Sequence, residues 1–440
     1  MPSRLAGVVF SVASETDMNG NFRLSKPCPP GTPSASRDVA LHRTLSLPLL
    51  VLYGLGVTIG AGIYVLIGAA ALRAGPAAPW SFALAAVVMG LTGATFAEFA
   101  GRVPSSAGEA AYVRLGFGSR HLALAIGALV LAVAMISAAA IAKGAAGYLS
   151  VLLPLRATVL TAVIVVVSGA VAARGVREAL SVAALMTLIE VGGLAAIIVG
   201  GVWHAPEDVM AMAGRTWALP QGITGWHGMF GAFLFAFFAL IGFESIVNLA
   251  EEAHAPSRIV PWAIGLTLGL ATALYVAVVI VAMALVPMDV LGASPAPLGL
   301  VFERATGLSP AMVATIAVVA TGNGVIAQII LSARVLYGLA RQQILPAWLG
   351  AVDARTKTPL KATVAATAVV LILSLPGRLD VLADLTSRMM LVVFFAVNAA
   401  LVAVKLRGDP APDSAVVVPL VVPMTAGLLS AGLLILSLVE

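Results

Sequence analysis

Two apolar stretches decide the fold, GLGVTIGAGIYVLIG at residues 54–68 and FLFAFFALIGFESIVNLAEEA at residues 233–253. Each is long enough to enter a bilayer, and each carries glycine in its middle, where a spanning helix tolerates it least. A lone interruption is typical of a tolerated kink. Two of them, one early in each half of the chain, predict a transporter whose substrate site is built from discontinuous helices near the membrane midplane.

Composition places the chain in a membrane. Hydrophobic residues make up 60% of its 440 positions and charged residues only 10%, which is too little polar surface to cover a soluble globule. We therefore expect an all-α polytopic membrane protein with about 11 transmembrane helices. The apolar stretches lie near residues 47–72, 80–100, 120–149, 157–173, 179–201, 226–250, 261–286, 309–340, 359–375, 381–404 and 416–438.

The lysines and arginines predict the orientation. With a cytoplasmic N-terminus, 17 of them fall in the tail and the cytoplasmic loops, and 5 fall in the outer loops. The opposite orientation would violate the positive-inside bias. We therefore expect a multi-pass protein of the cell (cytoplasmic) membrane with its N-terminus inside. The isoelectric point near 9.6 reflects this topology, and we expect no nucleic acid as a partner.

Residues 1–44 differ from the rest of the chain. They are rich in Pro, Ser and Gly and show no sustained periodicity, which predicts a disordered cytoplasmic tail. The single cysteine, Cys28, lies there, so neither an intramolecular disulfide nor a thiolate metal cluster can form. The five histidines fall at helix ends or in loops. We expect no metal, no cofactor and no enzymatic activity.

The first interruption contains four glycines within nine residues, Gly54, Gly56, Gly60 and Gly62. Each costs about 1 kcal/mol relative to alanine inside a helix, which indicates unwinding. A half-helix that resumes near Ala61 would present free amides, and such a terminus favours an anion by about 0.3–2 kcal/mol. A substrate carboxylate is the natural guest. Close helix packing through small residues is the alternative interpretation of the same glycines.

The second interruption lies around Ala239, Leu240, Ile241 and Gly242. The end of its first half would offer unpaired carbonyls to a cation. Carbonyls here and amides on the first segment together predict a receptor for a zwitterion.

Five motifs in this order resemble the amino acid/polyamine/organocation (APC) family of permeases from about residue 45 to residue 406. Besides the two interrupted stretches they are AEFAGRVPSSAGEAAYV at 97–113, GVREALSVAALMTLIEVGGL at 175–194 and IAQIILSARVLYGLARQQILP at 326–346. The resemblance implies two inverted repeats of five helices, which we place at 45–203 and 225–406. A loop and an eleventh helix would follow at 407–440.

The resemblance also implies a substrate site. The family holds the substrate carboxylate on amides of the first helix, and the matching positions are Ile59, Gly60, Ala61 and Gly62. It holds the α-amine on carbonyls of the sixth helix, which match Phe238, Ala239 and Ile241. Ala61 departs from the common GSGI pattern, so a hydroxyl often available to the carboxylate is absent, and Thr58 is the nearest replacement.

Glu190 lies about twelve residues into the fifth span, or roughly 18 Å at 1.5 Å per residue, close to the bilayer centre. A carboxylate there costs about 2.5–3.5 kcal/mol on insertion scales, so it should face the bundle interior. Some proton-coupled members of the APC family carry a lysine at the corresponding place, where it stands in for a sodium ion. Glu190 is therefore our candidate for proton coupling. A neutral glutamic acid that hydrogen-bonds a neighbouring helix is the alternative.

Two further residues are candidate gates. Glu244 follows the sixth-helix break directly and would line an inner gate or cap the second half-helix. Phe237, beside Phe238, would form an aromatic gate, although phenylalanines in membrane helices also serve as core or lipid contacts.

These features predict a secondary active transporter that carries amino acids across the cytoplasmic membrane by alternating access, in symport with protons. Its partners would be a small amino acid substrate, the lipid bilayer and the coupling proton. One alternative is an exchanger of amino acids without net ion coupling. Another is a pore or nutrient receptor that keeps the fold without turnover.

The topology can be tested with reporters. A reporter fused after Ser414 is expected to be cytoplasmic, because Lys405 and Arg407 precede it, and one fused at Glu440 is expected to be external. Reporter activity on each side of the membrane measures this. A cytoplasmic signal at Glu440 would mean that the last stretch does not cross.

Overall fold

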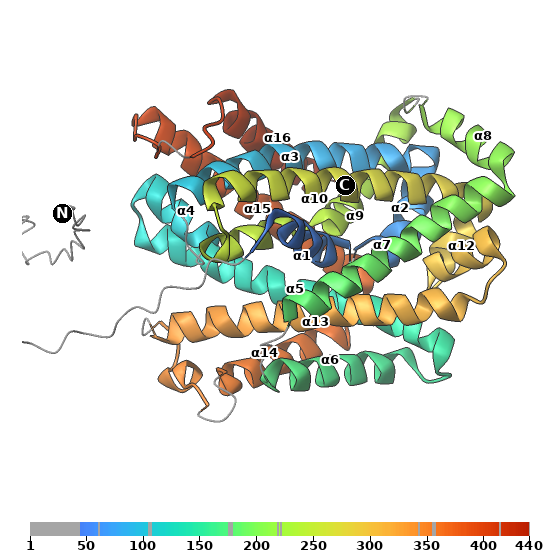
Figure 1. The fold of residues 1–440 in the computed structure, drawn as a ribbon, viewed down its shortest axis with the longest axis horizontal. Coiled ribbons are helices and arrows are strands. Elements are labelled where there is room, and N and C mark those ends of the chain that lie inside the picture. The colour runs from blue at the N-terminus through green and yellow to red at the C-terminus, as the bar shows by residue number, and fades with distance from the viewer. Residues whose placement is uncertain are drawn as a thin grey trace, which may run out of the picture. The chain divides into compact units, whose positions relative to one another are not determined.

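Helices make up nearly all of the chain that the computed structural model describes, which is residues 45–59, 62–103, 108–174, 179–217, 220, 222–341, 344–353, 358–412 and 415–439. The expected tail at 1–44 lies outside these residues. The long helices (Figure 1) are α1 (Leu47–Ile59), α2 (Gly62–Ala74), α3 (Ala78–Arg102), α5 (Arg120–Leu152), α6 (Ala157–Arg174), α7 (Ala179–His204), α9 (Gly222–Leu240), α10 (Pro256–Leu285), α13 (Pro310–Arg341), α14 (Leu360–Ser374), α15 (Leu379–Leu406) and α16 (Val421–Val439).

Shorter helical segments connect them. They are η1 (Gly75–Ala77), α4 (Gly108–Phe117), α8 (Pro206–Trp217), η2 (Phe243–Glu252), α11 (Met288–Ala293), α12 (Pro297–Thr306) and η3 (Ala347–Gly350), where η marks a 3₁₀ helix. The second half of the second interrupted stretch, Phe243–Glu252, is therefore a 3₁₀ helix. Within the described ranges the β-structure amounts to an isolated bridge between Leu45 and Ala253.

The predicted membrane spans are confirmed as helices. In the described part of the chain, nine helical segments are long and apolar enough to cross a membrane, and α1 and α14 are shorter apolar helices. One of the nine, Gly62–Arg102, contains both α2 and α3. All eleven predicted stretches thus fold as helices, and the chain is an all-α polytopic membrane protein.

The packing of the helices repeats between the two halves of the chain. Three pairs, α3 with α10, α5 with α13 and α6 with α14, each join one helix from either half (Figure 1). The other contacts match between the halves: α1 packs on α10 and α7, and α9, its counterpart in the second half, packs on α3 and α15. The connecting helices match too, because α4 packs on α5 and α15, as α12 packs on α13 and α7. This is the packing of an inverted-repeat transporter fold. The repeat bounds 45–203 and 225–406 stay a prediction.

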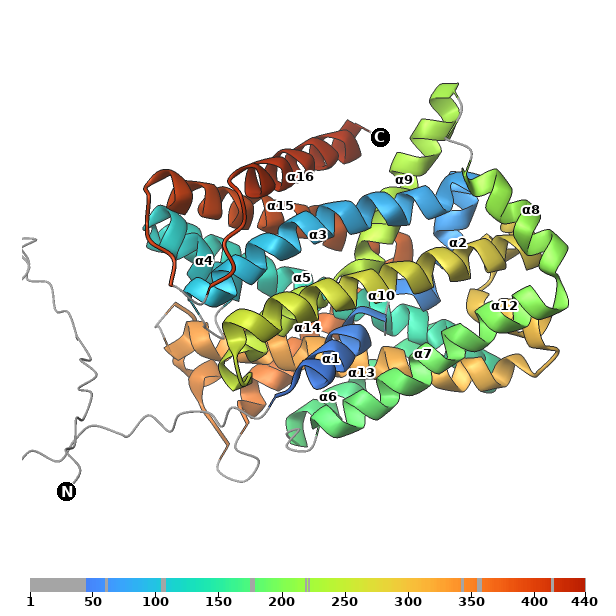
Figure 2. The ribbon, with the colours of Figure 1, turned by 45° about the horizontal axis from the view of Figure 1, so that its top comes forward.

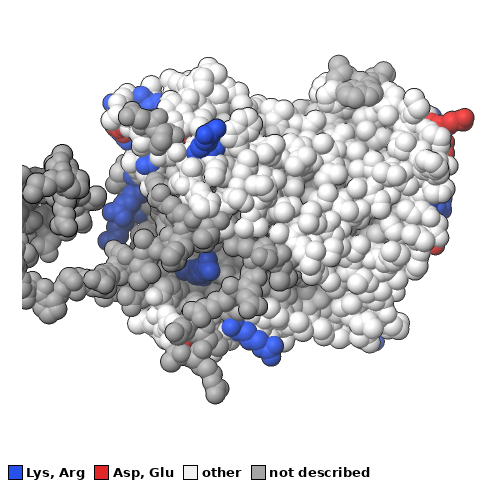
Figure 3. Space-filling model, viewed as in Figure 1, with Lys and Arg blue, Asp and Glu red and all other residues white. Residues whose placement is uncertain are grey.

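Apolar side chains cover the outside of the helical unit formed by Arg43–Glu440. Val199, Leu428 and Ile435 expose more than half of their surface on α7 and α16, as residues facing lipid do. Figure 3 shows a broad face without charged side chains, with most of the visible lysine and arginine toward the end where α4 lies.

A buried charge cluster fastens the connection between α15 and α16. The carboxylate of Glu98 on α3 pairs with Arg102 and with Lys405, each at 2.8 Å, and accepts a hydrogen bond from the amide of Val418 at 2.8 Å. Lys405 also donates to the carbonyl of Val418. Each charged side chain of this cluster thus contacts an opposite charge, as burial requires. Figure 2 shows α16 alongside α15 at the edge of the bundle.

Candidate functional site

Helix α1 ends at Ile59 and α2 begins at Gly62, and Gly60 and Ala61 between them lie outside the described residues. Gly62 rests directly on the second interrupted helix: a Cβ added there would lie 2.0 Å from the Cα of Ala239. A contact below 3.0 Å with backbone cannot be relieved by a side-chain rotation. Glycine at position 62 is therefore required by the close approach of the two helices.

The second interruption has the reciprocal arrangement. Helix α9 ends at Leu240, and Gly242 takes a φ of 137°, which L side chains rarely adopt. A Cβ at Gly242 would lie 3.0 Å from the backbone of Val57 and Thr58. Each break thus places a glycine against the backbone of the other helix. We call this contact the crossing, defined by Gly62 on Ala239 and Gly242 on Thr58.

Tyr275 of α10 joins the two helices at the crossing. Its buried hydroxyl donates to the carbonyl of Thr58 at 2.9 Å and to that of Ala239 at 3.1 Å. Both carbonyls belong to the C-terminal ends of helices, α1 and α9, where intrahelical donors run out. Because a phenol has one proton, the hydroxyl is shared between two acceptors. Sequence analysis missed Tyr275, although a tyrosine inside a span signals a polar partner.

The predicted substrate residues meet at the crossing. The described members of the set are Ile59, Gly62, Phe238, Ala239 and Ile241, whereas Gly60 and Ala61 lie outside the described residues. The carbonyl of Phe238 accepts a 3.2 Å bond from the amide of Ile241. The hydroxyl of Thr58 is buried and has no hydrogen-bond partner among the described residues. The roles of these groups toward a substrate stay predictions.

The candidate gates have defined contacts. The carboxylate of Glu244 accepts a 2.9 Å hydrogen bond from the amide of Gly242, so it caps the turn at the second break, one of the two roles predicted for it. Phe237 is fully buried and packs edge-on against Phe394 of α15, with ring centroids 5.6 Å apart. Opening and closing by either residue stays a prediction.

A second acid lies near Glu244. Glu109 of α4 is 7% exposed, and burial raises the pKa of its carboxyl above the usual range. It interacts electrostatically with Glu244 and with Tyr112. Sequence analysis missed Glu109 because it falls between expected spans, where acids are ordinarily exposed.

Glu190 lies on α7 at the level of the first break. One turn before Glu190, the hydroxyl of Thr187 lies against Gly56 of α1, where an added Cβ would lie 2.2 Å from the hydroxyl oxygen. The hydroxyl of Tyr64 on α2 donates to the backbone carbonyl of Glu190 at 3.4 Å. The Glu190 side chain is 2% exposed, and neither carboxylate oxygen has a hydrogen-bond partner in the described ranges. The side chain of Lys143 on α5 donates to the carbonyl of Ser374 at 2.9 Å.

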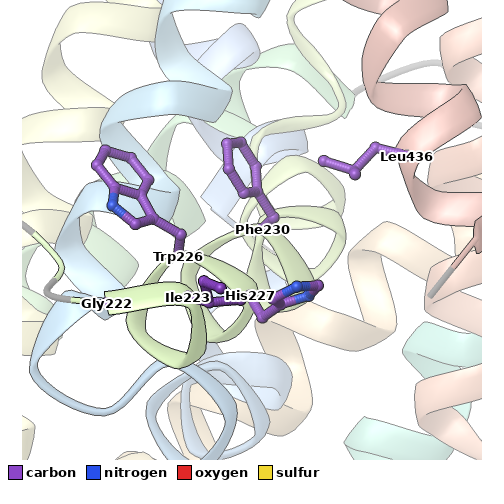
Figure 4. A pocket seen from close by; sticks show the side chains of 6 residues that line it. All are labelled: Gly222, Ile223, Trp226, His227, Phe230 and Leu436. Atoms are coloured by element: carbon purple, nitrogen blue, oxygen red, sulfur yellow. The ribbon is translucent and has the colours of Figure 1, made fainter.

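A surface hollow of about 440 Å³ lies apart from the crossing. It is lined by the first turns of α9, where Trp226 stacks on Phe230, and by Leu436 of α16 (Figure 4). Phe230 precedes Phe238 by eight residues, or about 12 Å of helix. The hollow is therefore separate from the crossing.

The comparisons agree with this architecture. A sequence profile of the amino acid permease family matches residues 45–439. Cationic amino acid transporter 2, vacuolar, of Arabidopsis thaliana is 30% identical over 74% of this chain and 54% of its own length. The branched-chain amino acid permease BcaP of Bacillus subtilis (strain 168) is 27% identical over 86% of this chain and 84% of its own length. The methylthioribose transporter of the same bacterium is 28% identical over 74% of each.

These matches identify the class. The fold and the crossing are those of a membrane transporter with discontinuous helices. The chain belongs to the amino acid permease family, within the APC group. It spans little more than half the length of the plant relative above.

The crossing can be tested by filling it. Gly62→Ala is expected to abolish uptake and to lower stability by about 1–3 kcal/mol, as overpacking does, because the added methyl collides with the backbone of α9. Thermal unfolding and uptake in proteoliposomes measure the two effects. Gly192→Ala is the control, since nothing lies within 4 Å of a Cβ there, and its uptake should match wild type. Equal uptake by both variants would contradict the close contact.

The role of Tyr275 can be tested with a matched pair of tyrosines. Tyr275→Phe leaves two buried carbonyls without their donor and is expected to lower stability by about 1–3 kcal/mol. Tyr112→Phe removes an equally buried hydroxyl that has no partner in the described residues, so stability should be unchanged or higher. Thermal unfolding of both variants in one detergent decides this. A larger loss for Tyr112→Phe would overturn the assignment.

Proposed function

We propose that the chain is a secondary active transporter that carries amino acids across the cell membrane by alternating access, coupled to protons. The observation that carries this proposal is the crossing, where two interrupted helices contact each other through Gly62 and Gly242. Two of the three relatives above bear the names of amino acid carriers, a cationic and a branched-chain one. These names support amino acids as the substrate class.

The crossing has the polarity that a zwitterion needs. Helices α1 and α9 end there, and α2 begins there at Gly62. Helix C-terminal ends favour a cation and N-terminal ends an anion. The α-amine would bind the carbonyls of Phe238, Ala239 and Ile241, and the carboxylate would bind the amides from Ile59 to Gly62. An incoming ammonium group brings three donors, so it can replace the Tyr275 hydroxyl at the Ala239 carbonyl.

Glu190 supports proton coupling by its position and its isolation. It lies beside the first break, yet its carboxylate has no partner among the described residues. Burying an unpaired carboxylate costs much more free energy than burying the neutral acid. A proton taken up on one side and released when the site opens to the other side would couple the rocking of the helices to the proton gradient.

The same proposal includes the orientation. We place the N-terminus in the cytoplasm of a cell whose plasma membrane holds the protein. The support is the Lys and Arg distribution along the sequence, together with the similarity to a permease of a bacterium, BcaP. The plant relative named above is called vacuolar.

Proton coupling is tested by Glu190→Gln, which fixes the side chain in its neutral form. Binding of substrate and counterflow exchange should survive, whereas accumulation driven by an imposed pH gradient should fall at least tenfold. Uptake into proteoliposomes with and without the gradient measures this. Glu207→Gln is the control, because Glu207 is an exposed acid on α8. This variant should accumulate substrate as the wild type does.

The outcomes separate the alternatives. Gradient-driven accumulation that survives Glu190→Gln would reduce Glu190 to a structural group. Counterflow without accumulation in the wild type would make the chain an exchanger. Flux that does not saturate would indicate a pore, and ligand binding without flux would indicate a receptor.

A further inference from the structure

A crevice between α7 and α13 is lined in part by Glu190. Its volume is about 210 Å³, and its lining, apart from Glu190, is Met186, Ile189, Thr315, Ile316, Val319 and Ala320. The hydroxyl of Thr315 is bonded to the carbonyl of Ala311 one turn earlier. The acidic residue of the lining is Glu190, whose two carboxyl oxygens are buried and have no partner in the described residues.

The mouth of the crevice faces outward from the bundle. Ile189 and Val319, on its two sides, are 42% and 43% exposed. Both belong to helices that are long and apolar enough to span a membrane. The crevice therefore opens where lipid would surround the protein, and a ligand would reach it from the bilayer rather than from water.

Glu190, a lining residue of the crevice, lies near the crossing. Glu190 interacts electrostatically with Tyr64 of α2 and with Tyr275 of α10, and Tyr275 holds the carbonyls of Thr58 and Ala239. A group that engages Glu190 from the crevice would thus act on the residues that join the two interrupted helices.

We propose that this crevice is a binding site for a small hydrophobic amine, entered from the membrane. Charge complementarity selects the amine: an ammonium group supplies three donors to two carboxylate oxygens without a partner, while the apolar walls accept a hydrocarbon body. Size limits the ligand, because pockets for drug-sized ligands have volumes of about 300–1,000 Å³ and this crevice is smaller. A lipid acyl chain would fit the walls but would leave the carboxyl unpaired.

The amine would inhibit transport without competing with the substrate. Held by an ammonium group, Glu190 stays ionised, and under the proposed function it cannot carry a proton. This consequence rests on the proposed function, whereas binding of the amine does not. The two are therefore measured separately.

Adamantylamine is the probe, since it joins a compact hydrocarbon body to one ammonium group and does not resemble an α-amino acid. Isothermal titration of the purified full-length protein in nanodiscs should show saturable binding. Glu190→Gln should weaken it at least tenfold by removing the charge. Val319→Trp, or Val319→Phe if the larger ring impairs folding, should weaken it at least tenfold by filling the crevice. Val199→Trp is the control, because Val199 is an exposed residue of α7 outside the crevice lining, and it should bind as wild type does.

The neutral analogue 1-adamantanol should bind at least tenfold more weakly than adamantylamine. Equal binding of the two would make the crevice an apolar or lipid site and overturn the proposal. No binding by the wild type, or undiminished binding by the Val319 variants, would overturn it as well. If the amine binds as expected but Glu190→Gln keeps gradient-driven accumulation, the crevice stands and the proton-coupling proposal falls. If Glu190→Gln loses gradient-driven accumulation but the wild type binds no amine, the proton-coupling proposal stands and the crevice proposal falls.

Discussion

The contact of Gly62 with Ala239, matched by that of Gly242 with Thr58, is the constraint on which the rest of the structure depends. A helix that breaks inside a bilayer frees backbone amides and carbonyls that lipid cannot satisfy. Here each break covers the other, and Tyr275 bonds one freed carbonyl from each. Helices α3, α7, α10 and α15 pack around the two interrupted helices. The bundle is thus arranged to keep lipid away from irregular backbone.

Two of the buried acids, Glu98 and Glu190, show what this constraint allows. Glu98 has cations on both of its oxygens and a backbone amide as well. Removing one partner from such a cluster costs about 3–5 kcal/mol, so it serves as a fixed anchor for the segment that leads to α16. Glu190 has no such partners in the described ranges and lies beside the crossing. An acid without fixed partners is the kind of group that the proposed function requires for proton coupling, whereas Glu98 is an anchor.

Much of the fold could be predicted from the sequence, because spans and breaks are local features. Runs of apolar residues located all eleven helical stretches, and the glycines located both interruptions. The residues that tie the structure together could not be predicted, because their partners lie far away along the chain. Tyr275 and Thr58 are separated by 217 residues, and Glu98 and Val418 by 320. The sequence could not predict the partner of Lys143, the carbonyl of Ser374, for the same reason. No local pattern reports such pairings, and the roles that the resemblance to a family gives Ile59 and Phe238 stay predictions.

The two halves are alike in packing but unequal in hydrogen bonding, which bears on how the site opens. On the α12 side, the hydroxyl of Tyr148 accepts from the amide of Leu298 at 3.1 Å and donates to the carbonyl of Tyr64 at 2.6 Å. It thus ties α12 to α2 through α5. On the α4 side, the ring of Tyr112 stacks on Phe99 at 4.6 Å, and its hydroxyl has no partner among the described residues.

Directional bonds must break before α2 can leave α5, whereas stacked rings can slide while keeping contact. Directional bonds act at the α4 end as well, where Arg407 donates to the carbonyls of Leu115 and Gly116. A carrier needs the difference in strength between the two ends to be small and reversible, because a ligand shifts a conformational equilibrium only by the difference between its affinities for the two states. One tyrosine hydroxyl has a net contribution of about 0.5–1.5 kcal/mol per bond, which is of the size that a substrate could overcome under the proposed function.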